Sequence, residues 1–292
     1  MSGTLTPWVR QVLGDHSIVG RPSATERRSG SGQHVIEVVD STGEHWFAKQ
    51  VAEGRAFRVE VRAYRHWVPA LGGFAPSLKA FDRDLRTLLI SSVPGEQASV
   101  NNREVHHRAG QLLRRLHGSC PARKQEPAQR EYTSRRLALI LATNPDLFTP
   151  AQVAFTRDQA TRIAELPVGK SVPCHGDYLP HNWLVDSANV LRIIDFGESR
   201  WDLPAFDFSK LFFNAWWRRP RLAASFFAGY GRQPTELELE FIRLRMATRA
   251  CAEVAFGHNR GSQQHVDHGH ARLSDLMAGY QVGIHEGPPD PL

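Results

Sequence analysis

Two carboxylates and a carboxamide stand at short intervals between residues 172 and 197. Asp177 ends a His-Gly-Asp run, Asn182 lies five residues later, and Asp195 belongs to Ile-Ile-Asp-Phe-Gly. Phosphoryl transfer from a nucleotide needs one carboxylate to accept or orient the proton of the attacking hydroxyl. It also needs an amide oxygen and a second carboxylate to hold Mg²⁺ against the phosphate oxygens. The spacing therefore predicts Asp177 as the base and Asn182 and Asp195 as metal ligands.

A hairpin must bring these three side chains together. The apolar runs 183–185 and 190–194 flank the turn-rich connector 186–189, which is typical of two paired strands. Folding this hairpin places Asn182 and Asp195 side by side at its open end, with Asp177 nearby. The alternative is that these polar residues only cap loops between buried strands. Capping would be the usual explanation of a single Asp or Asn, but it accounts poorly for three such residues at this spacing.

This stretch resembles the aminoglycoside phosphotransferases and their relatives, which are small-molecule kinases built on the protein-kinase fold. Their pattern is His-Gly-Asp, four residues, Asn, an apolar hairpin and then Ile-Asp-Phe or Ile-Asp-Trp, and residues 175–197 match it. Protein kinases carry His-Arg-Asp in the same place. The resemblance covers about residues 18–210, and it implies that His175 supports the catalytic loop.

The resemblance also implies a fold and a set of partners. The expected fold is α+β and bilobal, with a nucleotide-binding lobe over residues 1–92 and a mainly helical catalytic and substrate-binding lobe over residues 93–292. The small lobe should hold an antiparallel sheet. ATP or GTP would be the phosphoryl donor, Mg²⁺ the metal ion, and a hydroxyl group of a small molecule the acceptor.

The first part of the chain offers side chains that would position the nucleotide. Paired strands are expected within residues 34–51, and apolar residues at three- and four-residue steps predict a helix over 55–67. In the resembling family, the lysine that matches Lys49 grips the α- and β-phosphates and a helix glutamate orients it. Glu60 stands at the place of that glutamate, and Glu53, in the preceding turn, is the competing partner.

Backbone groups are expected to contact the nucleotide at two further places. A loop rich in Ser and Gly over residues 25–33, which includes Ser31, can fold over phosphates with its N–H groups; such repeats also occur in ordinary hairpin loops. The resemblance places an inter-lobe hinge at residues 91–96, where the carbonyl of Ser91 and the amide of Val93 would bind the base. A plain exit from a strand fits the same residues, and backbone contacts do not separate ATP from GTP.

Other elements follow from periodicity and turn residues. Further strands are predicted over 76–81 and 86–90, a surface loop over 121–130, and helices over 5–14, 104–117, 131–143, 150–166, 209–231 and 235–257. The resemblance implies that Asp207 braces the catalytic loop. We expect His117 to be a structural residue at a helix end. The histidines at 258, 265, 268 and 270 suggest zinc, but zinc needs three or four convergent ligands, so we expect no metal site there.

Composition limits the partners and the compartment. The three cysteines lie far apart, and no apolar run reaches the length of a membrane span, so we expect a reduced, cytoplasmic protein without a membrane partner. The net charge is +6, and residues 103–136 alone hold nine Arg and Lys against three Asp and Glu. Since no aromatic residues interleave with these charges on the expected helix face, we expect a solvated face and no nucleic-acid partner.

The substrate is the least constrained feature. The resembling family phosphorylates aminoglycosides, other antibiotics, choline, homoserine and sugars, and the motifs here are closest to the antibiotic kinases. We therefore expect an antibiotic substrate, either an aminoglycoside or another class such as a nucleoside, and hence a role in resistance. The alternatives are a metabolite kinase of the choline or homoserine type and a non-catalytic nucleotide-binding pseudokinase. A pseudokinase would normally lack one of Asp177, Asn182 and Asp195, and all three are present.

Overall fold

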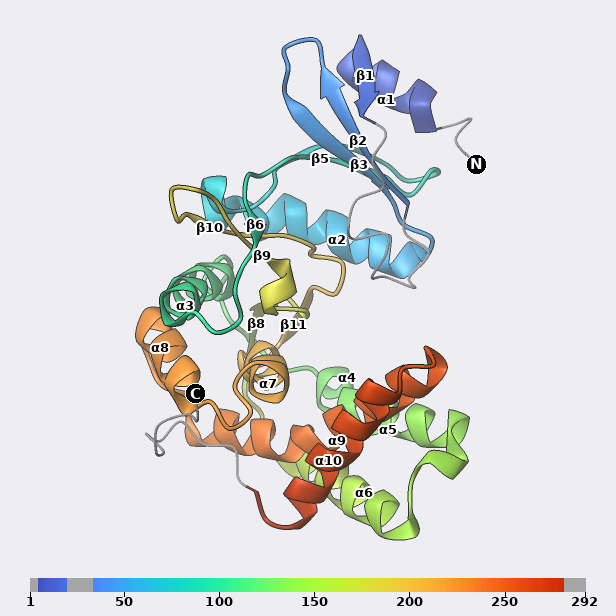
Figure 1. Ribbon diagram of the computed structural model, residues 1–292, viewed down its shortest axis with the longest axis vertical. Helices are drawn as coiled ribbons and strands as arrows, with labels where there is room; N and C mark the ends of the chain where they lie inside the picture. Colours follow the sequence, from blue (N-terminus) through green and yellow to red (C-terminus); the bar gives the residue numbers. More distant parts are fainter. Residues whose placement is uncertain (1–4, 20–33, 281–292) are drawn as a thin grey trace. The chain divides into compact units, whose positions relative to one another are not determined.

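The computed structural model describes residues 5–19 and 34–280, which belong to two compact units (Figure 1). The first unit comprises Met1–Ala98 and His175–Arg200, and the second comprises Ser99–Cys174 and Trp201–Leu292. The expected lobe boundary at residue 92 stays a prediction. Packing nevertheless places the segment with Asp177 and Asp195 in the same unit as the N-terminal strands, because the chain returns to that unit after residue 174.

A five-stranded antiparallel sheet forms the frame of the first unit. Its strand order is β1-β2-β3-β5-β4, and the strands are β1 (His16–Val19), β2 (His34–Asp40), β3 (His45–Gln50), β4 (Leu78–Asp82) and β5 (Thr87–Ser91). Helix α1 (Leu5–Leu13) covers one face, since Leu5 and Val9, one turn apart, pack in one buried cluster with Val38, Trp46 and Ala48. The expected paired strands within residues 34–51 and the expected first helix are confirmed.

Helix α2 (Gly54–His66) follows the central strand β3 closely, and the short helix η1 (Val68–Phe74) continues from it. Phe57, Glu60, Val61 and Tyr64 are buried on one side of α2, which is the stripe at three- and four-residue steps that an amphipathic helix buries. Successive side chains of a strand point to opposite faces of the sheet. Lys49 therefore points away from the face on which Ala48 packs with α1.

A second, three-stranded sheet completes the first unit. Its order is β10-β9-β6, with β6 (Glu96–Gln97), β9 (Trp183–Val185) and β10 (Leu191–Ile193). The expected hairpin is present, and Trp183 pairs with Ile193 in its antiparallel ladder. Strand β6 was not expected from the sequence. It pairs with β9, with Glu96 opposite Val185.

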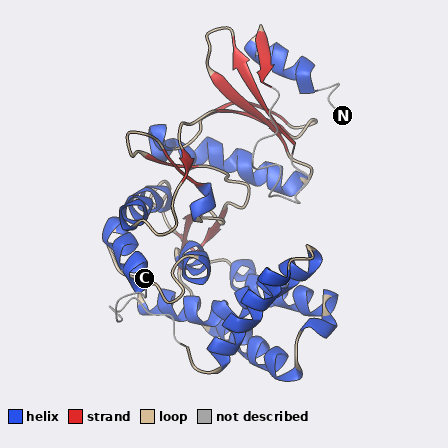
Figure 2. Ribbon diagram, in the orientation of Figure 1, coloured by secondary structure: helices blue, strands red, loops and turns tan. Residues whose placement is uncertain are grey.

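Helices dominate the second unit (Figure 2). They are α3 (Arg103–His117), α4 (Pro127–Arg130), α5 (Tyr132–Thr143), η2 (Pro145–Leu147), α6 (Pro150–Glu165), α7 (Ala205–Asn214), α8 (Pro220–Tyr230), α9 (Glu236–Asn259) and α10 (Gln263–Met277). A small sheet of order β11-β8-β7 accompanies them, with β7 (Arg123–Lys124), β8 (Lys170–Cys174) and β11 (Arg200–Asp202), which begins on the last residue of the first unit. The segment 121–130, expected as a loop, thus contains β7 and α4.

The aromatic stripe of the second unit is its core. Phe208 and Phe212 of α7 pack against Phe227 of α8 with ring centroids 5.1 and 6.2 Å away. The helical stretch expected over residues 209–231 is interrupted between α7 and α8, because Pro220 starts a new helix at its first turn. Among the described residues, no helix has the length and apolar character needed to cross a membrane.

Candidate functional site

The β9–β10 hairpin is closed by its own turn residues. Asp186 Oδ1 accepts hydrogen bonds from the backbone N–H groups of Ala188 and Val190, both at 2.9 Å, and Asn189 adopts the left-handed conformation at φ 59°, which Asn tolerates better than most residues. At the open end, the N–H of Ile194 donates to the carbonyl of Asn182 at 3.0 Å. Asn182 and Asp195 therefore lie next to each other, as the spacing predicted.

The loop before the hairpin is held by His175, which is fully buried. The N–H of Asp177 donates to His175 Nδ1 at 3.2 Å, so the ring proton is assigned to Nε2, which donates to the carbonyl of Ile194 at 3.1 Å. Phe196 packs against the same ring at 4.7 Å between centroids. His175 thus connects the loop to the segment after β10.

Gly176 cannot be replaced by a larger residue without a backbone shift. Its φ is +82°, and a Cβ atom there would lie 2.0 Å from the carbonyl oxygen of Glu198. Only glycine adopts this conformation without steric cost. The glycine lets the backbone before Asp177 pass close to the segment after Asp195, at Glu198.

Lys49 bridges two carboxylates in the interior of the first unit. Its Nζ lies 2.9 Å from Glu60 Oε1 and 2.8 Å from Asp195 Oδ1. Glu60 stands in the buried stripe of α2, whereas Glu53, the competing candidate, is the exposed residue that precedes this helix. The structure therefore brings Lys49, Glu60 and Asp195 together, from β3, α2 and the end of the hairpin.

Burial and charge set the ionisation of this group. Burial alone would lower the pKa of Lys49, but Asp195 and Glu60 outweigh it and the pKa is raised, so the ammonium keeps its charge. Lys49 in turn holds the pKa of Asp195 below its usual value, against the opposing effect of burial. Burial raises the pKa of Glu60, and the attraction of Lys49 offsets only part of this rise.

Two donors bind one oxygen of the Asp177 carboxylate. Asn182 Nδ2 donates to Asp177 Oδ2 at 3.1 Å and to the backbone carbonyl of Asp177 at 2.9 Å. His181 Nε2 lies 3.0 Å from the same Oδ2 atom. Since Nδ2 of Asn182 is directed at Asp177, the amide oxygen of Asn182 is the atom that can bind a cation.

Asn182 and Asp195 fit a magnesium ion by their donor chemistry. An amide oxygen and a carboxylate are the hard oxygen ligands that Mg²⁺ prefers, and the lowered pKa of Asp195 keeps its carboxylate ionised. Asp195 also adopts φ 64°, which is uncommon outside glycine. Strained backbone of this kind is concentrated at functional sites. Both residues are thus suitable ligands, and their role as such stays a prediction.

The expected contacts to the base and phosphates are less defined. Ser91 is the last residue of β5; its N–H donates to the carbonyl of Ser77 at 2.9 Å, and its hydroxyl accepts from the N–H of Ser77. Val93 is half-buried in the stretch between β5 and β6. Ser31 lies outside the described residues. The roles of all three in nucleotide binding stay predictions.

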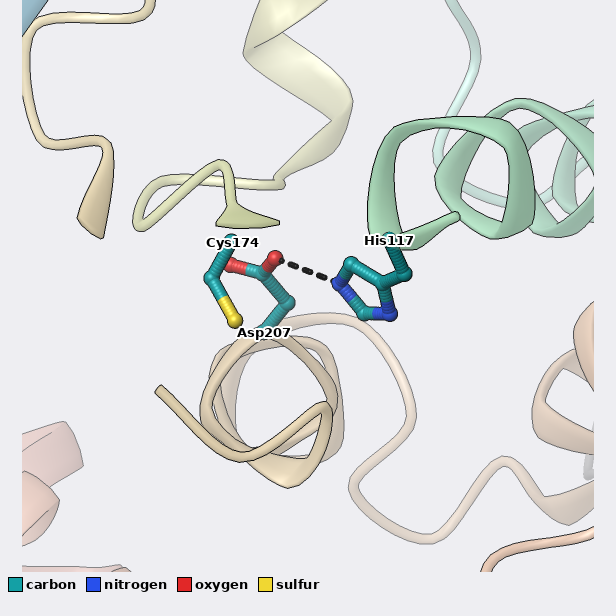
Figure 3. A group of neighbouring side chains, drawn as sticks. All are labelled: His117, Cys174 and Asp207. Carbon is teal, nitrogen blue, oxygen red and sulfur yellow. Dashed lines mark hydrogen bonds and ion pairs between the residues drawn. The ribbon is translucent and has the colours of Figure 1, made fainter. Parts of the chain in front are cut away.

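His117 and Asp207, both buried in the second unit, form a hydrogen-bonded group with Cys174 as neighbour (Figure 3). His117 Nε2 lies 3.1 Å from Asp207 Oδ2, and its Nδ1 lies 2.9 Å from the hydroxyl of Tyr230. The thiol of Cys174 lies 3.4 Å from the carbonyl oxygen of Leu203. Potential metal-binding atoms of the three residues lie within 4.8 Å of one another. Because these side chains already have hydrogen-bond partners among themselves and in the residues around them, we interpret the group as structural, as expected for His117.

The histidines near the C-terminus converge only partly. His265 Nε2 and His268 Nδ1 on α10 lie 4.0 and 3.6 Å from Glu253 Oε1 on α9. The ring of His265 also bonds to the hydroxyl of Ser262 at 2.7 Å through Nδ1. Burial and the nearby Arg272 lower the pKa of His268. These contacts fit a surface ion-pair group, and the expectation that no metal binds there stays a prediction.

Sequence reasoning missed His181. It occupies the position before Asn182, and nothing in its spacing distinguishes it from an ordinary exposed loop histidine. The only available signal was its separation of four residues from Asp177, which would matter only if the intervening chain turned back. A single histidine without a recognised partner is weak evidence of function.

Comparisons with known proteins agree with this geometry. A family model described as "Phosphotransferase enzyme family" matches residues 23–242. The search of curated protein sequences returned no match. Macrolide 2'-phosphotransferase MphH from Brachybacterium faecium has a similar structure, with 18% identity, a TM-score of 0.64, and coverage of 92% of this chain and 97% of that one.

Two other solved structures show the same fold. A thermostable mutant of aminoglycoside phosphotransferase APH(4)-Ia is 13% identical with a TM-score of 0.65, covering 93% of this chain and 98% of its own. Choline kinase LicA from Streptococcus pneumoniae is 13% identical with a TM-score of 0.65, covering 92% and 99%. At such low identities the likeness concerns the fold, and it confirms the expected protein-kinase-like α+β class.

Proposed function

Because the chain belongs to the phosphotransferase enzyme family, we propose that it transfers the γ-phosphoryl group of ATP or GTP to a hydroxyl of a small molecule. The proposal is carried by one observation: Asp177, Asn182 and Asp195 converge in the unit that also holds the Lys49–Glu60 pair. In the reaction, the acceptor oxygen bonds to the γ-phosphorus. The bond to the bridging oxygen breaks, and the nucleoside diphosphate leaves with that oxygen.

Each group has a distinct task in this proposal. Asp177 orients the acceptor hydroxyl and takes its proton. The amide oxygen of Asn182 and the carboxylate of Asp195 would hold Mg²⁺, which neutralises charge on the phosphate oxygens when bound. Lys49 binds phosphate oxygens of the nucleotide while Glu60 keeps its ammonium in place. Preorganised charges of this kind supply most of the rate enhancement in phosphoryl transfer.

The acceptor we propose is an antibiotic, as the sequence motifs suggested, so the protein would confer resistance. Helix α9 supports a neutral or weakly charged antibiotic over a polycation, because three of its four acidic groups already face cationic or histidine side chains. Glu238 binds Arg232 at 2.6 Å, Glu240 binds Arg162 at 2.9 Å, and Glu253 faces His268 at 3.6 Å. A polycationic aminoglycoside would have to displace these partners to gain from the same carboxylates.

Nucleotide turnover across a panel of acceptors tests the proposal. Release of ADP or GDP is measured with Mg²⁺ and macrolides, nucleoside antibiotics, aminoglycosides, cyclic peptides, choline and homoserine. We expect turnover with one antibiotic class, and a macrolide or nucleoside before an aminoglycoside. Turnover with choline or homoserine alone would make the protein a metabolite kinase, and nucleotide binding without any turnover would make it a pseudokinase.

Replacing the proposed base separates chemistry from binding. In Asp177→Asn we expect kcat to fall by about 10²–10⁴-fold, the range for loss of a general base, while nucleotide still binds. Asp84→Asn is the matched control, since Asp84 is exposed in the turn between β4 and β5. Turnover of Asp177→Asn near the wild-type rate contradicts the assignment of Asp177.

A further inference from the structure

His181 contacts the proposed base directly. Its Nε2 lies 3.0 Å from Oδ2 of Asp177, the oxygen that also accepts from Asn182 Nδ2 at 3.1 Å. Both donors therefore approach the same side of the carboxylate. The side chain of Asp177 is 25% exposed and that of His181 is 40% exposed, so the contact lies where a small molecule can reach it.

The backbone between the two residues fixes this contact. The N–H of Leu179 donates to the carbonyl of Asp177 at 2.9 Å, and the N–H of Asn182 donates to the carbonyl of Leu179 at 2.8 Å. Residues Pro180–Asn182 form the short helix η3, and Pro180 restricts its own φ to a value that suits the turn. The chain turns back within four residues and carries the imidazole to the carboxylate.

The hydrogen bond assigns the proton of the imidazole. An ionised carboxylate only accepts hydrogen bonds, so His181 must donate from Nε2. A neutral imidazole with its proton on Nε2 can make this bond, and the contact does not require a charged ring. An amide nitrogen in the same place would serve equally well, whereas an aliphatic side chain would leave the bond unmade.

We propose that His181 is a positioning residue for phosphoryl transfer. Together with Asn182 it fixes the rotation of the Asp177 carboxylate, and so its orientation toward the acceptor hydroxyl. This inference rests on the proposed function, because it assumes that Asp177 receives the proton. Reacting groups must be held in near-attack geometry, and a small misplacement of the base costs up to about 100-fold in rate.

Two substitutions at residue 181 test the role. His181→Leu removes the donor, and we expect kcat to fall by about 10- to 100-fold with the KM for nucleotide unchanged. In His181→Gln the amide nitrogen can reach Asp177, so most of kcat should return. His258→Leu, at the exposed end of α9, is the control and should keep wild-type kinetics. The acceptor is the one that the panel identifies, and thermal melts check that each variant is folded.

A double-variant cycle shows whether His181 acts through Asp177. In single-turnover experiments, His181→Leu should have little further effect once Asp177→Asn is present. A full additional loss of rate in the double variant overturns the inference, as does a wild-type kcat in His181→Leu. Failure of His181→Gln to recover activity also overturns it, since a donor at that place would then be insufficient.

These results separate the two proposals. If wild-type protein turns over no acceptor, the proposed function fails and the role of His181 fails with it. The other case is an active wild type, an inactive Asp177→Asn and a His181→Leu as active as the wild type. In that case the proposed function stands and only the role of His181 fails.

Discussion

Lys49 lies between two carboxylates in the interior of the first unit, so Lys49→Met should destabilise the protein strongly. The side chains of Lys49 and Glu60 are 7% and 1% exposed, and Nζ lies 2.9 and 2.8 Å from Glu60 and Asp195. At these distances each contact contributes about 6 kcal/mol of Coulomb energy at an effective dielectric constant near 20. Desolvation of each buried ion costs several kcal/mol and offsets much of this.

Methionine keeps the approximate length of the lysine and removes its charge, which leaves Glu60 buried beside an apolar chain. Removing one partner of a buried ion pair costs about 3–5 kcal/mol, and we expect this loss in the free energy of unfolding at pH 7. The double variant Lys49→Met/Glu60→Leu leaves no buried carboxylate on α2. Its loss should be smaller than the sum of the two single losses by at least about 1 kcal/mol, since residues in contact are coupled.

The loss should also depend on pH. Burial raises the pKa of Glu60, and among the described residues its Oε2 has no hydrogen-bond partner. A carboxyl group with a raised folded-state pKa is favoured in its protonated form, so the folded state gains stability as pH falls. Without Lys49 this effect is stronger, and the deficit of Lys49→Met should shrink between pH 8 and pH 5.

Urea unfolding followed by tryptophan fluorescence measures these quantities, because Trp46 lies in the buried core of the sheet. Lys124→Met, an exposed lysine on β7, controls for the substitution itself. A Lys49→Met protein within about 1 kcal/mol of the wild type would refute the reasoning, because a buried Glu60 without its partner would then carry little cost. Strict additivity in the double variant would refute it as well.

Two further predictions concern backbone and turn geometry. Gly176→Ala should lower the melting temperature and reduce turnover. A left-handed conformation costs roughly 1–2 kcal/mol for a non-glycine residue, and the new Cβ would lie 2.0 Å from the Glu198 carbonyl oxygen. Gly73→Ala is the control: its Cβ position has open space around it, so this variant should match the wild type in both assays. Asp40 accepts hydrogen bonds from Thr42 and Trp46, which lower its pKa from 3.8 to about 2. A lowered carboxyl pKa stabilises the fold above pH 3.8, and this gain is lost as pH falls through 2. Melts of Asp40→Asn should therefore lie below the wild type at pH 7, and the difference should shrink as pH falls toward 2.

Much of the fold follows from local patterns in the sequence. The capping box in which Thr149 and Gln152 bond each other's backbone marks the start of α6 where Thr-Pro predicted it. Interruptions and minor strands were harder to predict. Strand β6 pairs with β9, and β8 pairs with β7, both distant in sequence. The residues of β6 and β8 themselves therefore give little indication of a strand. The break between α7 and α8 was missed because apolar residues continue through it, and Pro220 alone marks the new start.

In the site, the two aspartates and the asparagine were predicted from their spacing, and Lys49 and Glu60 from the resemblance to the family. Glu60 is a carboxylate in a stripe where the periodicity of α2 calls for apolar side chains, and a buried charge there requires a partner. Lys49 is likewise a charged residue at a buried position of a central strand, and its Nζ lies 2.9 Å from Glu60 Oε1. Glu53 was the weaker candidate because the sequence places it in the turn before the helix; in the structure it is exposed and needs no such partner.

His181 shows the limit of that reasoning. It is exposed, it lies in a short turn, and it breaks no periodicity. Its sequence position therefore fits a solvent-exposed residue without a role as well as it fits a functional residue. Its contact with Asp177 depends on two backbone hydrogen bonds, from Leu179 and Asn182, that no side-chain pattern records. A residue that acts by holding another side chain in place becomes visible only when the turn between them is known. For that reason the base and the metal ligands were predicted from spacing, and the residue that orients the base was not.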